Sequence, residues 1–92
     1  MIKSFRCAET EKLFRRERVA RFANLAGVAQ RKLEQLHMAG ALDDLRVPPG
    51  NRLEALKGDR RGQHSIRVNG QFRLCFIWRN GAAEEVEIVD YH

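Results

Sequence analysis

The hydrophobic pattern of this chain changes its period at one short segment, Val47-Pro48-Pro49-Gly50-Asn51. Before the segment, apolar residues recur at intervals of three and four, which is typical of a helix with one buried face. These residues are Phe22, Leu25, Ala29, Leu33 and Leu36. After the segment, apolar and polar residues alternate, as in strands that bury one face. The sequence therefore predicts an α+β fold in which helices come first and strands follow.

The N-terminal half also contains weaker signals. Residues 2–6 alternate enough to form a short first strand, and Thr10 is placed to cap a brief helix that runs through Phe14. The longer helix should begin between Asn24 and Gly27 and end near Gly40, because glycine is a poor helix former and a common helix terminator. We therefore expect two N-terminal helices after a short strand.

The C-terminal half predicts three strands joined by two hairpins. The first hairpin, with a three-residue loop over 68–70, pairs Ile66 with Phe72, His64 with Leu74 and Ser65 with Arg73. A two-residue loop at Asn69-Gly70 would instead mix the apolar and polar faces.

The same argument applies to the second hairpin. A loop over Asn80-Gly81-Ala82 pairs Leu74 with Ile88, sets Arg73 opposite Val89, and sets Gln71 opposite Tyr91. One face of the predicted antiparallel sheet is then apolar and receives the helices. The other face presents Arg67, Arg73, Glu87 and Tyr91, and function is expected there.

Length and composition limit the class of protein. The 92 residues, with 43% hydrophobic and 32% charged residues, suit one globular domain over 1–92 with a single core. No apolar run approaches the ~18 residues of a membrane span, and no signal-peptide stretch follows Met1, so a cytoplasmic protein without membrane contact is expected. Cys7 and Cys75 do not form the pattern of a disulfide framework or a zinc site, and are expected to be buried, reduced thiols.

The net charge is +5 at pH 7, and the excess of positive charge lies in one stretch. Between Arg52 and Arg79 the chain has one lysine and six arginines, but only Glu54 and Asp59 as acids. A solvated charged face is the simplest explanation for such a run. Because the charges alternate with core residues, a phosphate-binding surface is favoured.

No phosphate-binding glycine loop, metal-ligand spacing or Ser-His-Asp arrangement is found, so neither a metal nor another cofactor is expected. Instead, basic residues accompany a terminal Asp90-Tyr91-His92. This set suits metal-independent RNA cleavage by the 2′-hydroxyl, which needs a base, an acid and fixed positive charge. His92 and Tyr91 can be base and acid in either order, and Asp90 can orient His92. Arg73 and Lys57 can stabilise the phosphorane.

The segments 51–60, 62–69, 72–76 and 86–92, ending in Asp-Tyr-His, resemble HigB-type toxins of the RelE/ParE toxin superfamily. The resemblance extends over nearly the whole chain. It implies a RelE-like α+β fold with two N-terminal helices on one face of a small antiparallel sheet. It also implies a type II toxin-antitoxin toxin that cleaves mRNA in the ribosomal decoding site and thereby inhibits translation.

The resemblance assigns roles to individual residues. It implies that Asp90, Tyr91, His92, Arg73 and Lys57 are catalytic, and that Arg60, Arg61 and Arg67 contact RNA or the ribosome. Some HigB toxins have an active-site histidine where this chain has Glu54, so that carboxylate is a possible catalytic base or a structural group. The implied partners are the ribosome, mRNA and a HigA-type helix-turn-helix antitoxin, through which alone the toxin would reach operator DNA.

Two other functions fit the same fold. A ParE-like toxin would inhibit DNA gyrase by binding, without chemistry of its own, and a basic nucleic-acid-binding adaptor would not use its terminal residues chemically. Neither requires Lys57, Arg73, Tyr91 and His92 together, whereas phosphodiester cleavage uses all four. Fold similarity alone does not separate these functions.

Overall fold

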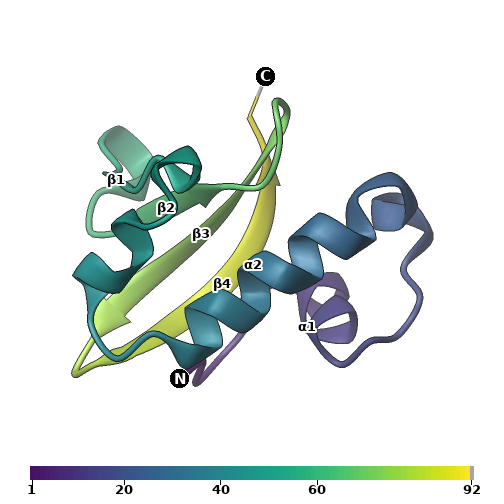
Figure 1. Ribbon diagram of the computed structural model, residues 1–92, viewed down its shortest axis with the longest axis horizontal. Coiled ribbons are helices and arrows are strands. Elements are labelled where there is room, and N and C mark those ends of the chain that lie inside the picture. The colour runs from purple at the N-terminus through teal and green to yellow at the C-terminus, as the bar shows by residue number, and fades with distance from the viewer. Residues whose placement is uncertain (92) are drawn as a thin grey trace.

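The computed structural model describes residues 1–91 and has helices in its first half and strands in its second (Figure 1). The elements are the α-helices α1 (Ala8–Phe14) and α2 (Ala26–Met38), the 3₁₀ helices η1 (Ala20–Leu25), η2 (Leu42–Arg46), η3 (Pro49–Asn51) and η4 (Gly58–Arg60), and the strands β1 (Glu54–Ala55), β2 (His64–Arg67), β3 (Phe72–Arg79) and β4 (Ala82–Asp90). The predicted α+β architecture is confirmed. None of the helices among residues 1–91 has the length and apolar character needed to span a bilayer.

Helix α2 is the longer of the two α-helices and carries the predicted apolar stripe. Its buried residues are Ala29, Leu33 and Leu36, while Phe22 and Leu25 are buried in η1 immediately before it. The helix ends at Met38 because Ala39 already has extended backbone, one residue before Gly40. The stripe therefore packs as expected, with its first turn in 3₁₀ geometry.

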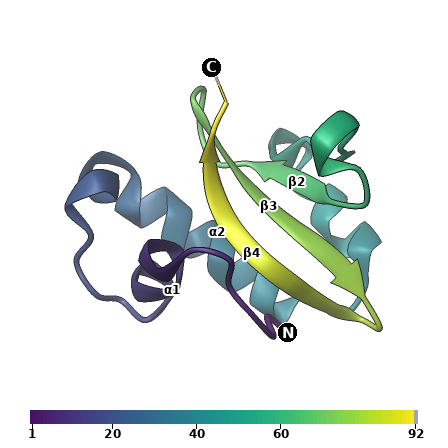
Figure 2. The same cartoon turned by 180° about the vertical axis from the view of Figure 1, so that it is seen from behind.

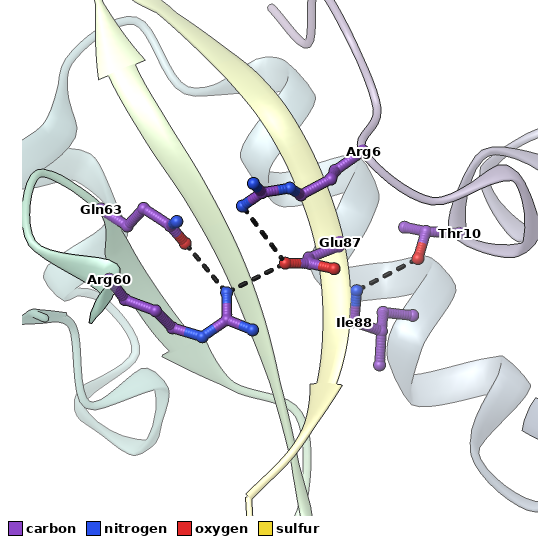
Figure 3. Close-up of polar contacts among 6 residues, drawn as sticks. All are labelled: Arg6, Thr10, Arg60, Gln63, Glu87 and Ile88. Carbon is purple, nitrogen blue, oxygen red and sulfur yellow. Dashed lines mark hydrogen bonds and ion pairs between the residues drawn. The ribbon is translucent and has the colours of Figure 1, made fainter. Parts of the chain in front are cut away.

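Thr10 does not cap α1, so that prediction was wrong. The helix begins at Ala8, and Thr10 is fully buried within it. Its Oγ1 atom accepts the backbone N–H of Ile88 at 3.1 Å (Figure 3). The hydroxyl thus satisfies a donor on β4, a tertiary role that local sequence does not reveal.

Removing this hydroxyl should destabilise the protein measurably. Thr10→Val keeps the shape of the side chain but leaves the buried Ile88 N–H unsatisfied, and we expect a loss of about 1–3 kcal/mol in the free energy of unfolding. Thr10→Ser retains the acceptor and is the matched control. Urea unfolding monitored by circular dichroism measures both, and equal stability of Thr10→Val and wild type would contradict this role.

The N-terminal segment is attached to β4 by two isolated parallel bridges, not by a regular strand. Ile2 pairs with Ala83, and Phe5 pairs with Val86. The segment therefore covers the first half of the β4 edge, but the short strand predicted over residues 2–6 does not form.

The sheet has four antiparallel strands in the order β1-β2-β3-β4. The strands β2, β3 and β4 were predicted from the C-terminal half of the sequence. The additional strand is the two-residue β1, which pairs Glu54 with Ser65 and Ala55 with His64. A two-residue strand is too short to show alternation, so periodicity could not detect it.

The predicted register between β2 and β3 was wrong by two residues. Ile66 pairs with Leu74, and Arg67 lies directly opposite Arg73. The loop is wider than predicted because the Asn69 side chain accepts the N–H groups of Gln71 and Phe72, each at 2.8 Å. A shift of two leaves each side chain on its predicted face.

The register between β3 and β4 was predicted correctly at the end near the C-terminus. Leu74 pairs with Ile88, and Arg73 pairs with Val89. At the other end the turn has two residues instead of three, Asn80 and Gly81, both with positive φ. A register shift between Cys75 and Ile77 then restores the predicted pairing.

Helix α2 lies behind the sheet in Figure 2 and covers one sheet face, whereas α1 lies to the side of β4. That face supplies buried residues to the core, among them Ile66, Leu74, Phe76, Val86 and Ile88. The opposite face contains Arg67, Arg73 and Tyr91, which the sequence associated with function.

Candidate functional site

The polar face of the sheet has a cavity of about 210 Å³ at the end where β4 finishes. Its lining comes from the residue after η3, from β1, β2 and β3, from the β2–β3 loop and from the residue after β4. The lining residues are Arg52, Glu54, Arg67, Asn69, Gly70, Gln71, Arg73 and Tyr91. Arg73, Arg67, Tyr91 and Glu54 were all candidates from the sequence, and the fold gathers them here.

Arg73 is the most firmly held side chain of the cavity. Its Nε donates to Ser65 Oγ at 2.7 Å, and its Nη2 donates to the Arg52 carbonyl at 2.6 Å. The side chain is only 12% exposed, and Nη2 lies 3.5 Å from a carboxylate oxygen of Glu54. The guanidinium is therefore fixed in orientation before any ligand binds.

Arg52 was not singled out from the sequence as a site residue. It has left-handed backbone (φ 47°), which directs its carbonyl to Arg73, and its side chain lines the cavity. The preceding residue anchors it, because Asn51 is fully buried and its Nδ2 donates to the Leu45 carbonyl at 3.1 Å. Lys32 donates to the same asparagine's Oδ1. The Pro-Gly-Asn run was the only signal of this turn.

Tyr91 reaches the cavity from the end of β4 and is held by Gln71. The backbone N–H of Tyr91 donates to the Gln71 carbonyl at 2.6 Å, and the Gln71 side-chain amide donates to Asp90 at 3.0 Å. Asp90 itself does not belong to the lining, since it pairs with Phe72 on the alternate side of the strand. His92, the remaining residue of the predicted catalytic triplet, lies outside the described residues.

Two ionisable groups on this face favour their neutral forms. Burial raises the pKa of the Tyr91 phenol above its usual value, with Cys75 acting in the same direction and Arg60 opposing it. Burial also raises the pKa of Cys75 to about 11, although Arg60 counteracts it. Tyr91 is therefore a hydrogen-bond donor near neutral pH.

The raised pKa of Cys75 predicts an unreactive thiol. Only the thiolate is alkylated, and a pKa of about 11 in place of 9.0 lowers its fraction by about 100-fold at pH 8. In a Cys7→Ser variant, which leaves Cys75 as the sole cysteine, iodoacetamide should modify the folded protein at least about 100-fold more slowly than the urea-unfolded one. Mass spectrometry measures this ratio, and comparable rates would contradict the assigned burial.

The remaining predicted basic residues are more widely distributed. Arg60 donates to Glu87 at 2.9 Å and to Gln63 at 3.2 Å, and Arg6 approaches the same Glu87 oxygen at 3.9 Å (Figure 3). The Arg60 guanidinium is thus already bonded within the protein. Lys57 and Arg61 are exposed on either side of η4, and neither is part of the cavity lining. Of the predicted basic residues, the structure therefore places Arg67 in the cavity lining but not Lys57.

The geometry suits a bound oxyanion. Arg73 supplies a fixed planar cation, Arg52 and Arg67 supply further positive charge, and Tyr91 offers a phenol beside them. Glu54 already places a carboxylate against Arg73. Within residues 1–91, no group of three or more His, Cys, Asp or Glu side chains could hold a metal ion.

Comparison with solved structures gives the class of fold. A mutant of YafQ from E. coli aligns over 98% of this chain and 93% of its own, with a TM-score of 0.62 and 11% identity. The heterotetrameric YoeB-YefM toxin-antitoxin complex from Staphylococcus aureus contains a chain that aligns over 100% and 98%, with a TM-score of 0.59 and 16% identity. These likenesses define the fold, which is shared with YafQ and with a chain of the YoeB-YefM complex.

The sequence narrows this class to one family. Residues 3–92 match the family described as the RelE-like toxin of type II toxin-antitoxin system HigB, and the chain belongs to this family. Toxin HigB-1 of Vibrio cholerae serotype O1 is 58% identical over 53 residues, which are 58% of this chain and 56% of that protein. An uncharacterised protein of Haemophilus influenzae is 41% identical over 58 residues, 63% of this chain and 57% of its own length. The matched stretches thus span little more than half of these relatives.

Proposed function

We propose that residues 1–92 form one toxin domain that cleaves mRNA on the translating ribosome without a metal ion and so stops translation. The observation that carries this proposal is the cavity in which the fixed Arg73 guanidinium and the Tyr91 phenol share one lining. Phosphodiester cleavage by a 2′-hydroxyl requires fixed positive charge and a proton donor, and these two side chains can supply both. Membership of the HigB-like toxin family supports the same activity.

In the proposed reaction the 2′-oxygen attacks the adjacent phosphorus and the bond to the 5′-oxygen breaks. Arg73 stabilises the negative charge that develops on the phosphorane oxygens. Tyr91 protonates the leaving 5′-oxygen, a role that suits a phenol, which carries its proton near neutral pH and whose pKa burial raises further. His92 removes the 2′ proton and Asp90 orients it, with Glu54 as the alternative base. Gln71, which binds both Asp90 and Tyr91, positions this end of the chain.

The other predicted cations would guide RNA toward the cavity. Arg61 and Lys57 are exposed near η4 and can contact phosphates of mRNA or ribosomal RNA, Lys57 thereby acting outside the immediate centre. Arg60 can contribute in the same way only by exchanging its Glu87 partner for a phosphate. Lys57 is thus proposed as a peripheral contact, in place of the catalytic role expected from the sequence.

The proposed partner in the cell is an antitoxin of the HigA type, a helix-turn-helix protein through which the toxin would reach operator DNA. The family is that of type II toxin-antitoxin toxins, and one structural relative was solved as a toxin-antitoxin complex. Action on translating ribosomes would place the toxin in the cytoplasm. Co-expression with the neighbouring gene product, followed by co-purification, tests the partnership.

Mapping of new RNA 5′ ends tests the activity. Brief expression of the chain should yield cuts confined to translated reading frames, and purified toxin should cut ribosome-bound mRNA equally well with EDTA when ribosomes are kept intact by polyamines. Cuts in untranslated transcripts would refute ribosome dependence. Arrest of DNA supercoiling with intact mRNA would instead support a gyrase inhibitor, and RNA binding without cleavage would support an adaptor.

A further inference from the structure

Two arginines lie directly opposite each other on the polar face of the sheet. Arg67 of β2 and Arg73 of β3 are Cα partners, and both line the cavity. Like charges at directly opposed positions of an antiparallel pair are destabilising. Among the described residues that line the cavity, Glu54 is the sole carboxylate, and it forms an ion pair with Arg73. The arrangement therefore leaves excess positive charge beside Arg73.

A third arginine, Arg52, adds to this charge from a turn that other residues of the fold hold in place. Arg52 has left-handed backbone, which is unfavourable for a residue with a Cβ atom and needs support from its surroundings. That support comes from the fully buried Asn51 before it and from Arg73, which donates to the Arg52 carbonyl at 2.6 Å. The turn therefore fixes the backbone of Arg52 relative to Arg73, and its side chain extends from that point into the cavity lining.

The positive potential of this region reaches the neighbouring helix. Burial is the first cause of a lowered pKa at Lys32 on α2, and the charges of Arg31 and Arg67 act in the same direction. Arg67 therefore lies close enough to α2 for its positive charge to act on Lys32. An anionic ligand in the cavity would relieve the repulsion between the arginines.

We propose that Arg52 and Arg67 form a second phosphate subsite beside the one at Arg73, so that the cavity binds two successive phosphates of single-stranded RNA. Each guanidinium can bond two phosphate oxygens at once, and opposed residues of paired strands have Cβ atoms only ~5 Å apart. Arg73 then holds the reacting phosphate, and Arg52 with Arg67 holds its neighbour. The inference rests on the proposed ribonuclease function and specifies how the substrate strand lies in the site.

Short 2′-O-methylated oligonucleotides test the subsite without cleavage, because the attacking hydroxyl is blocked. A trinucleotide has two phosphodiesters and a dinucleotide has one, and NMR titration gives the affinity of each for the whole chain. In wild type the trinucleotide should bind about 10-fold more tightly, the size expected of one charge-assisted contact. In Arg52→Asn and Arg67→Gln this advantage should fall below about 3-fold, and the slope of log affinity against log salt should decrease by ~0.7.

The control variants separate this effect from a loss of fold or of general charge. Asparagine tolerates left-handed backbone, so Arg52→Asn removes the guanidinium while keeping the turn. Arg79→Gln removes a cation from the far end of β3, outside the cavity lining, and should leave the trinucleotide advantage unchanged. Arg73→Gln should weaken both oligonucleotides alike. An unchanged advantage in both subsite variants, or no trinucleotide binding by wild type at millimolar concentration, overturns the proposal.

The outcomes for the subsite and for the enzymatic function are distinguishable. If Arg52→Asn loses the trinucleotide advantage but wild type does not cut translated mRNA, the subsite stands and the ribonuclease function fails. If wild type cuts mRNA while the advantage is unchanged in the variants, the function stands and the subsite fails.

Discussion

Arg73→Lys is expected to slow cleavage of ribosome-bound mRNA by about 100-fold or more, the loss typical of removing one fixed donor from a transition-state site. Lysine keeps the positive charge but cannot bond Ser65 Oγ and the Arg52 carbonyl together with a phosphate. The effect should appear in kcat more than in KM, because oriented charge acts mainly on the transition state. Single-turnover cleavage at saturating ribosome concentration measures it.

Two variants test whether orientation, and not charge alone, explains the effect. Ser65→Ala removes the acceptor of Arg73 Nε and should slow cleavage by about 10-fold, because the guanidinium keeps its charge but loses one of the bonds that orient it. Arg79→Lys makes the same replacement at the far end of β3 and should cleave at the wild-type rate. If Arg73→Lys retained wild-type kcat, Arg73 would be no more than one cation among several.

The sheet faces could be predicted from the sequence, but one register could not. Alternation over residues 64–78 specifies which side chains share a face, and a register shift of two residues preserves that alternation. The choice depended on the Asn69 side chain, which accepts the backbone N–H groups of Gln71 in the loop and of Phe72 at the start of β3. Because the register error was an even number of residues, each side chain kept its predicted face, and Arg73 and Tyr91 were still correctly expected on the same one.

The parts of the site that escaped prediction depend on contacts between distant residues. Arg52 is presented to the cavity because Asn51 is buried and bonded to Lys32, 19 residues away in sequence. Lys57 was grouped with Arg73 by its charge, but the chain leaves the sheet after the two-residue β1 and turns into η4. Neither the bonds of Asn51 nor the path of the chain from β1 into η4 leaves a periodic pattern in the sequence, so neither could be predicted.

Tyr91→Phe should reduce the cleavage rate by about 100-fold or more, within the range of a lost general acid. The replacement removes only a hydroxyl from a side chain that is 41% exposed, so the free energy of unfolding should change by less than about 0.5 kcal/mol. Equal unfolding midpoints in urea, together with the rate loss, would assign the effect to chemistry.

The pH dependence distinguishes an acid from a base at this position. Because burial raises the pKa of Tyr91, the phenol stays protonated throughout pH 6–9, and an acid role predicts no fall in the wild-type rate over that range from loss of this proton. A base role would require the phenolate, whose fraction is small there but rises tenfold with each pH unit, and Tyr91→Phe would then abolish a rising limb. Gln71→Ala is the matched positional control, since it releases the side-chain contact to Asp90 while leaving the phenol intact. A rate loss in Gln71→Ala with an unchanged pH profile would mean that Gln71 positions the reacting groups. A wild-type rate in Tyr91→Phe would remove Tyr91 from the mechanism and leave the charge of Arg73 as the cavity's contribution to catalysis.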